Sequence, residues 1–288
     1  MTVGAVCRIL CRMTARALLL SLALMAGAAA SDLKPQTLEA FQRYVSARDG
    51  AFDREIRGDP FLWVDGQAEQ SLNYHGQLKS GEVVIHEIEQ LQNGKPFSVP
   101  DGMVHHWLGV VFIPGVKVGD VVRLVEDYDN HSKYYAPEVT RSKLLSRDGD
   151  HFLAYLRFRK KHILTVTVDT WHEAWYTTIS PTRAASRSQI TRAQEVQNES
   201  EKNEKLLPDG EGHGFLWRMN TYWKFEEQDG GTYVQCESVT LTRSIPFLLK
   251  PVIEPFVTSV PRESLAGVLT HTRAAALAAK APKAEGKP

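Results

Sequence analysis

Cysteine is scarce in this sequence, and neither positive nor negative charge is in excess. The 288 residues include three cysteines, and two of them, Cys7 and Cys11, lie in an apolar leader. Only Cys236 remains for the folded chain, which excludes an internal disulfide framework and favours a small buried side chain. Lys and Arg number 34, as do Asp and Glu. A neutral chain lacks the positive field of a non-specific nucleic-acid-binding protein, so no nucleic-acid partner is expected.

The apolar run near the N-terminus is too short to cross a membrane. Residues 17–30 are interrupted only by Ser21 and end in small residues, whereas a transmembrane helix needs about 20 apolar residues. A basic segment with Arg8, Arg12 and Arg16 precedes the run. This pattern predicts a signal peptide over residues 1–30, cleaved near Ala30, and export to the periplasm or the medium. Its removal takes away three arginines and no acidic residue, so the exported chain is slightly acidic.

Signatures of nucleotide binding and of the common catalytic sites are also missing. The sequence contains no phosphate-binding glycine loop, no dinucleotide fingerprint and no nucleophile elbow. Its histidines do not have metal-ligand spacing: His105 and His106 are adjacent in a predicted strand and point to opposite faces, and the same holds for His172 and Glu173. The sequence therefore predicts no metal site and no cofactor.

The N-terminal part of the exported chain reads as an extension of residues 31–102. Apolar residues at near-helical spacing between Pro35 and Gly58 predict an amphipathic helix. Residues 58–81 have a loop-like pattern, and residues 82–92 alternate as a strand does.

From Met103 onward strands dominate, and residues 103–279 read as one domain. The pattern predicts a strand, two short helices (residues 118–125 and around 134–135), six strands and a final long helix after Pro261. The six strands are expected at residues 138–146, 151–159, 163–179, 183–196, 215–227 and 232–243. Asp229 and Gly230 form the clearest hairpin signal. Strands joined by short turns are antiparallel, and one amphipathic helix can cover such a sheet. Residues 280–288 read as a disordered tail.

Prolines interrupt the apolar segment that precedes the final helix. Four of them, at positions 246, 251, 255 and 261, predict that no long regular element spans this segment. Its apolar part, residues 247–257 from Phe247 to Val257, either packs beneath the final helix, or gates a cavity, or makes a transient contact with a membrane.

Several local motifs carry a resemblance to a known superfamily. They are HHWLG at 105–109, FIPG at 112–115, DYD at 127–129, YAPEV at 135–139, FLWR at 215–218, YWKFE at 222–226, GGT at 230–232 and PRESL at 261–265. With these motifs in this order, the sequence resembles the START-like, or polyketide cyclase/dehydrase-like, superfamily, and looks like an exported bacterial member.

The resemblance implies an α+β helix-grip fold. In that fold a curved antiparallel sheet of about seven strands wraps around a long C-terminal helix, and the N-terminal helical extension would lie outside it. Superfamily members bind apolar or amphipathic ligands, and some are cyclases. The motifs are architectural, so the resemblance assigns no catalytic residue.

Strand alternation assigns side chains to the two faces of the sheet. The face that carries Trp217, Met219 and Trp223 is predicted to line a cavity suited to a lipid, sterol or aromatic molecule. His172 and Tyr176 would lie at its polar end. The candidate ligand-binding residues are His106, Tyr135, His172, Tyr176, Ser188, Trp217, Met219, Trp223 and Glu237.

Two polar strand faces are predicted to face solvent. One carries Tyr155, Arg157 and Arg159, and the other carries Arg218, Asn220, Lys224 and Glu226. In an antiparallel sheet with one buried face, such polar residues alternate with the core residues and point outward.

Three functions remain open on the sequence alone. The first is an exported binding or carrier protein for a hydrophobic or amphipathic small molecule. The second is a cyclase, dehydratase or hydrolase acting in the same cavity, for which His172 with Tyr176, or His106 with Glu237, are the candidate acid–base pairs. The third is a structural or interaction protein with a vestigial cavity and an exposed apolar surface at residues 247–257. The sequence leaves the oligomeric state undetermined.

Overall fold

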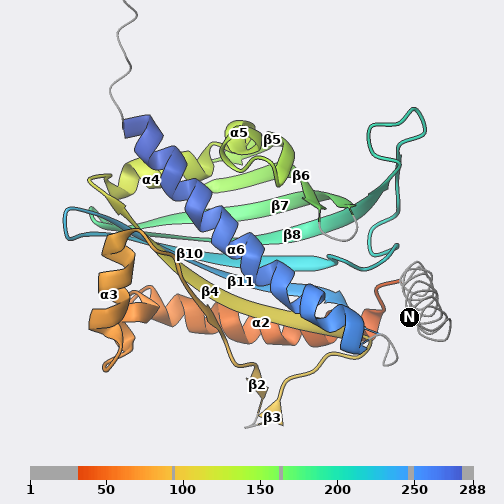
Figure 1. The fold of residues 1–288 in the computed structure, drawn as a ribbon, viewed down its shortest axis with the longest axis horizontal. Coiled ribbons are helices and arrows are strands. Elements are labelled where there is room, and N and C mark those ends of the chain that lie inside the picture. Colours follow the sequence, from red (N-terminus) through yellow and green to blue (C-terminus); the bar gives the residue numbers. More distant parts are fainter. Residues whose placement is uncertain (1–31, 93–94, 162–164, 246–249, 281–288) are drawn as a thin grey trace, which may run out of the picture.

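A computed structural model describes residues 32–92, 95–161, 165–245 and 250–280, without the side chains of residues 91–96 and 250–258. The predicted signal peptide, residues 247–249 and the tail beyond Lys280 lie outside this description, as do the side chains of residues 250–257. The described part has one large antiparallel sheet in the order β1-β4-β11-β10-β8-β7-β6-β5, and β9 pairs with β8. Figure 1 shows helix α6 running diagonally across one face of this sheet.

The sheet contains the seven strands predicted for the domain, the strand predicted within the extension, which is β1, and one short strand that was not predicted, β9. The strands of the described chain are β1 (Val84–Glu87), β2 (Leu91–Gln92), β3 (Lys95–Pro96), β4 (Gly102–Pro114), β5 (Val139–Asp148), β6 (His151–Lys161), β7 (Thr165–Ser180), β8 (Arg183–Gln197), β9 (Lys205–Leu206), β10 (Arg218–Gln228) and β11 (Gly231–Arg243). The β10–β11 hairpin turns at Asp229 and Gly230, which have φ angles of 56° and 75°. Asp and Gly tolerate this left-handed conformation, which a tight two-residue hairpin requires.

The helices lie on both sides of the sheet. They are α2 (Pro35–Glu55), η1 (Trp63–Gly66), α3 (Ser71–Ser80), α4 (Val118–Glu126), η2 (Tyr128–Asn130), α5 (His131–Tyr134) and α6 (Lys250–Lys280). The element order from β4 to α6 confirms the predicted strand, two short helices, six strands and long helix. The chain therefore has the α+β helix-grip architecture, with a curved antiparallel sheet and a C-terminal helix.

Each long helix buries one stripe of side chains, and the two stripes face opposite sides of the sheet. In α6, Leu265 and Leu269 are buried against the face that carries Val111 and Phe225, which we call the inner face. In α2, Phe41 is buried with Tyr222 and Leu241 on the other face, which we call the outer face. The spacing of four residues between Leu265 and Leu269 brings both side chains to one side of α6.

The N-terminal extension is more ordered than its sequence pattern indicates. The predicted helix over residues 35–58 is α2. Residues 58–81, predicted as a loop, contain η1 and α3. Apolar periodicity does not predict helix α3, because Leu78 is its one buried residue. Strand β1 pairs with β4, so the strand predicted within the extension is an edge strand of the main sheet.

The prediction that prolines prevent a long element before residue 261 is wrong. Helix α6 begins at Lys250 and continues through Pro251, Pro255 and Pro261. Pro251 lies in the first turn, where no intrahelical N–H bond is lost. Pro255 and Pro261 each remove one interior hydrogen bond, and the helix continues past both of them.

The two polar faces predicted as solvent-facing are largely covered. Arg157 is 3% exposed, because it pairs with Asp169 beside it and with Glu204 from the segment after β8. Lys224 is 3% exposed and Glu226 is 6% exposed. Alternation correctly separates the faces of a strand, but it does not indicate that α2 and a long loop cover the outer one.

Candidate functional site

One half of the inner face is a filled core. Around the C-terminal half of α6, the buried residues Leu265, Leu269 and Ala276 pack with Phe225 and Ile113 from the sheet. Gly109 permits this close approach, since a Cβ atom there would lie 2.5 Å from Cδ1 of Leu269. This end of the helix–sheet interface is occupied by the protein's own side chains.

The rest of the inner face carries small polar side chains in register across three neighbouring strands. Ser188 on β8 pairs with Thr221 on β10, and Thr221 pairs with Ser238 on β11. The hydroxyl groups of Ser188 and Thr221 are 2.8 Å apart. All three side chains are partly exposed although the face lies under α6. Small side chains beneath a helix leave room that large core residues would fill.

Two buried polar atoms beside this row have no hydrogen-bond partner within the described residues. They are Nε1 of Trp107 on β4 and Oγ1 of Thr240 on β11. Trp107 pairs with Ser238, and Thr240 pairs with His105, so the two residues are diagonal neighbours on the inner face. Buried polar groups in native proteins are nearly always paired, with protein, water or ligand.

Tyr135, His172 and Tyr176 lie on the inner side, as predicted, and each has its own partner. The hydroxyl of Tyr135 lies 3.2 Å from Oγ1 of Thr272 on α6. Nε2 of His172 lies 2.8 Å from Oγ1 of Thr170. Tyr176 donates to the carbonyl oxygen of Val125. The three side chains thus support the packing between sheet and helices.

Burial keeps these groups uncharged. Burial, together with the nearby His131, lowers the pKa of His172 to about 3. Burial also raises the pKa of Tyr135 and of Tyr176 well above the ordinary tyrosine value. His172 and Tyr176, one of the two predicted acid–base pairs, hydrogen-bond to separate partners, and the inner site has no exposed charge from them.

The aromatic and sulfur side chains that were predicted to share one face of residues 215–227 lie on both faces of the sheet. Trp223 is buried on the inner face, and its ring is stacked with that of Phe225 at a centroid distance of 5.9 Å. Met219 packs against the inner-face cluster that contains Ile190. Trp217 packs in the outer-face cluster under α2. The prediction that Trp217 shares the cavity wall is wrong, because β10 begins at Arg218 and strand alternation does not extend to residue 217.

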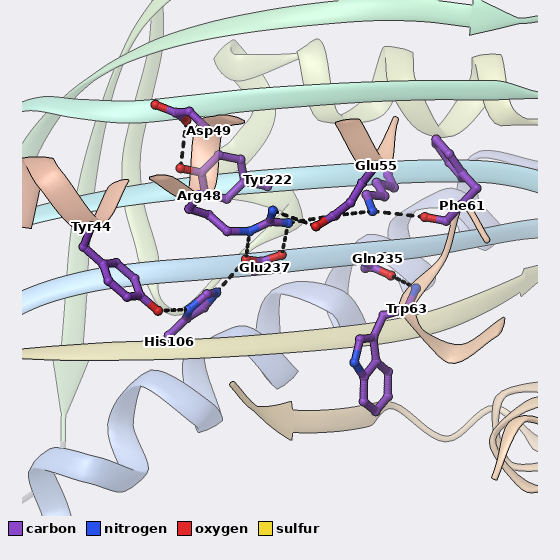
Figure 2. A network of polar contacts seen from close by, with 11 residues as sticks. Tyr44, Arg48, Asp49, Glu55, Phe61, Trp63, His106, Tyr222, Gln235 and Glu237 are labelled. Carbon is purple, nitrogen blue, oxygen red and sulfur yellow. Dashed lines mark hydrogen bonds and ion pairs between the residues drawn. The ribbon is translucent and has the colours of Figure 1, made fainter. Parts of the chain in front are cut away.

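His106 and Glu237 also lie on the outer face, contrary to their predicted place in the cavity beneath the C-terminal helix. They do meet: Nε2 of His106 is 2.5 Å from Oε1 of Glu237. Figure 2 shows them in a network under α2. The hydroxyl group of Tyr44 lies 2.6 Å from Nδ1 of His106, and the guanidinium group of Arg48 donates hydrogen bonds to Glu237. Both ring nitrogens of His106 are engaged within the protein, so neither is free to take a proton from a substrate.

The network holds a buried carboxylate in its charged form. Burial raises the pKa of Glu237, but hydrogen bonds from His106 and Arg48 outweigh burial and lower it to about 2. Burial and the charge of Glu237 raise the pKa of Tyr44 to about 12. The carboxylate can only accept, so Nε2 of His106 donates to it.

Sequence reasoning missed the partners that α2 contributes to this network. Tyr44, Arg48 and Glu55 follow one another at spacings of four and seven residues, so they share a helix face. The apolar residues Phe41, Val45 and Phe52 occupy the same face. Charged residues inside an apolar helix stripe were the available signal for a buried polar network.

The described residues contain no group of three or more His, Cys, Asp or Glu side chains that could hold a metal ion. No helix among them is both long and apolar enough to cross a membrane.

Comparison with solved structures gives matches of fold over about three fifths of the chain. A STAR-related lipid transfer protein from Xanthomonas axonopodis is 19% identical, with a TM-score of 0.37 over 61% of this chain and 96% of that one. The Zhui aromatase/cyclase from Streptomyces sp. R1128 is 11% identical, with a TM-score of 0.42 over 65% and 100%. A START superfamily protein from Mycobacterium smegmatis is 9% identical, with a TM-score of 0.41 over 61% and 99%.

No protein-family model and no curated protein matches the sequence. At these identities and TM-scores, the solved structures indicate nothing about a ligand or a reaction. The order of elements and the sheet topology carry the assignment instead. The chain is similar to the START-like, or polyketide cyclase-like, superfamily in its helix-grip fold.

Proposed function

We propose that the protein binds a hydrophobic or amphipathic small molecule between the inner face of the sheet and the N-terminal half of α6. The observation that carries this proposal is the pair of unpartnered polar atoms, Nε1 of Trp107 and Oγ1 of Thr240. An unmade hydrogen bond at a buried donor costs about 1–3 kcal/mol. A ligand that brings an acceptor oxygen to these atoms recovers that free energy.

The neighbouring side chains indicate which other chemical groups the ligand should have. Met219, Ile190 and Trp223 offer apolar and aromatic surface, while Ser188, Thr221 and Ser238 offer hydroxyl groups along one row. A mostly apolar site with few convergent polar groups is the usual composition of a small-molecule pocket. A lipid, sterol or aromatic molecule with one hydroxyl or carbonyl oxygen has matching chemistry.

Binding of cis-parinaric acid, a fluorescent polyene carboxylic acid, tests the proposal. The wild-type protein should bind it saturably, and Thr221→Trp should weaken binding at least tenfold, because the indole fills the space beside Ser188 and Ser238. Thr191→Trp is the matched control, since Thr191 is an exposed residue of the adjacent β8. Unchanged binding by a folded Thr221→Trp protein would overturn the proposal.

A second variant removes one donor and keeps an aromatic side chain at the same position. Trp107→Phe eliminates the indole N–H and retains an aromatic ring. We expect parinaric acid to bind about three- to tenfold more weakly, the range that one hydrogen bond provides. The circular dichroism spectrum of this variant should equal that of the wild type.

We further propose that this binding takes place outside the cytoplasm. The support is the basic, apolar and small-residue pattern of residues 1–30. Mass spectrometry of the protein expressed in its own host should find a chain that begins at Ser31 in the exported fraction. A cytoplasmic protein that retains residues 1–30 would contradict this proposal.

A further inference from the structure

The outer face has a pocket of its own, which the sheet separates from the inner face. Its volume is about 370 Å³, and it lies between α2, η1 and strands β4, β10 and β11. Phe61, Leu62 and Leu108 form apolar walls, and all three are at most 3% exposed. Arg48, Glu55, Lys224 and Glu237 also line the pocket, and Figure 2 shows Arg48, Glu55 and Glu237 within their polar network.

Hydrogen bonds to the sheet fix the segment that closes this pocket. Nζ of Lys224 donates to the carbonyl oxygen of Phe61 at 3.0 Å. The backbone N–H of Trp63 donates to Oε1 of Gln235 at 2.7 Å. Both anchors are visible in Figure 2. The pocket is therefore part of the folded structure and does not require a ligand to assemble it.

Donors remain unused in the pocket, and the carboxylate oxygens beside them already accept hydrogen bonds. Gln235 is 1% exposed, and its amide nitrogen has no hydrogen-bond partner among the described residues. Lys224 has three N–H groups and two acceptors, Glu55 and the Phe61 carbonyl. Each carboxylate oxygen of Glu55 already accepts at least one bond from Arg48 or Lys224.

The oxygens of Glu237 are occupied as well. Arg48 donates to both of them, and His106 donates to one. A ligand that supplies an acceptor atom can therefore bond to the N–H groups of Lys224 and Gln235 that are unused among the described residues.

The charges of the pocket cancel. Arg48 and Lys224 are cationic, and Glu55 and Glu237 are anionic. A site without net charge offers no net attraction to offset the desolvation of an added carboxylate. An uncharged acceptor oxygen bonds to the free N–H groups without that larger desolvation cost.

We propose that this outer pocket is a second ligand site, which takes an uncharged molecule with an apolar body and a carbonyl oxygen. The apolar body lies against Phe61, Leu62 and Leu108, and the carbonyl oxygen accepts from the amide of Gln235 and the ammonium group of Lys224. This site is independent of the inner-face site, and either one can exist without the other.

A matched series of three compounds tests the chemistry by isothermal titration calorimetry. 4-Phenyl-2-butanone has an apolar ring and an uncharged carbonyl, 3-phenylpropionate replaces the ketone by a carboxylate, and butylbenzene has no acceptor. The wild-type protein should bind the ketone at least tenfold more tightly than the other two. Equal binding of butylbenzene, or no binding of the ketone at millimolar concentration, would overturn the proposal.

Two substitutions on one helix locate the site. Ala51 lines the pocket, whereas Ala47, one turn earlier on α2, is exposed. Ala51→Trp should weaken ketone binding at least tenfold, and Ala47→Trp should leave it within twofold of the wild type. Neither alanine side chain takes part in the hydrogen bonds of the network, which are made by Arg48, Glu55 and their partners.

The inner-face variant distinguishes the two sites. Thr221→Trp should leave ketone binding unchanged, while Ala51→Trp should leave parinaric acid binding unchanged. Ketone binding that disappears in Thr221→Trp and persists in Ala51→Trp would place the ketone on the inner face and refute the second site. Failure of parinaric acid to bind the wild type bears on the proposed function alone.

Discussion

Arg48 on α2 and Glu237 on β11 stand 189 positions apart in the chain and form a two-point ion pair beneath α2. Nη2 of Arg48 lies 2.7 Å from Oε2 of Glu237, and Nε binds Oε1. Their side chains are 11% and 4% exposed. The pair ties the N-terminal helix to a central strand of the helix-grip sheet, so the extension and the sheet are parts of one folded unit.

The first prediction concerns the strength of this link. Arg48→Met leaves the carboxylate of Glu237 buried without its main cationic partner, and such a break costs about 3–5 kcal/mol. Chemical denaturation should report this loss in the free energy of unfolding. Lys34→Met is the control, because the Lys34–Asp101 pair is more than half exposed and contributes at most about 1 kcal/mol. Equal effects of the two substitutions would contradict the buried role of Arg48.

The second prediction concerns acid stability. The pKa of Glu237 is lower in the folded chain than its ordinary value of 4.5, at about 2. The ionised carboxylate therefore stabilises the fold fully above about pH 4.5, and this contribution is lost as the pH falls from 4.5 to 2. In Glu237→Gln, the free energy of unfolding should change less across that interval. The same slope in variant and wild type would show that other carboxylates govern the acid transition.

A third prediction follows from the buried neutral state of His172. Burial lowers its pKa from 6.5 to about 3. The unfolded chain takes up a proton on this ring below pH 6.5, and the folded chain does not, so stability declines as the pH falls from 6.5 to 3. The His172→Phe protein should lack this part of the pH dependence. An NMR titration that shows the His172 ring protonated at pH 6 in the folded wild type would contradict the prediction.

The close contact of α6 with the sheet gives a fourth prediction. Leu269→Ala should cost about 2–5 kcal/mol, because Leu269 is fully buried. Gly109→Ala alone should cost about 1–3 kcal/mol, since its Cβ would lie too close to Leu269 and Ile85. In the double variant the new methyl group occupies part of the space that Leu269 leaves. The combined loss in a double-mutant cycle should be clearly smaller than the sum, and strict additivity would argue against the contact.

Pro261 provides a fifth prediction, which tests the continuity of α6. It occupies an interior position of the helix that begins at Lys250, where proline is about 3 kcal/mol less favourable than alanine. Pro261→Ala should therefore raise the free energy of unfolding by about 1–3 kcal/mol. A neutral or destabilising effect would indicate that a separate helix starts at Pro261 and that the two segments are not one helix.

Periodicity predicted the elements of this fold well. Strand alternation and the turn at Asp229 and Gly230 identified β10 and β11, and helical spacing identified α2 and the second half of α6. These predictions succeeded because each of these elements buries one face, and the spacing of its apolar residues follows that face. Helix α3 was missed for the same reason, since Leu78 is its one buried residue.

The candidate site was predicted less completely. Alternation separated Trp223 from Lys224, but it did not say which element covers each face. His106 and Glu237 were correctly paired and assigned to the wrong side of the sheet, because their partners, Tyr44 and Arg48, lie in a helix distant in sequence. The unpartnered atoms of Trp107 and Thr240 depend on tertiary packing, and no local pattern reports them.

Native mass spectrometry of the protein purified from its own host tests the ligand most directly. The wild-type chain should carry a non-covalent adduct of an apolar or amphipathic molecule, and the adduct should be absent from Thr221→Trp and present in Thr191→Trp. A folded wild-type chain without any adduct, whose fluorescence also fails to respond to parinaric acid, would contradict ligand binding at the inner face.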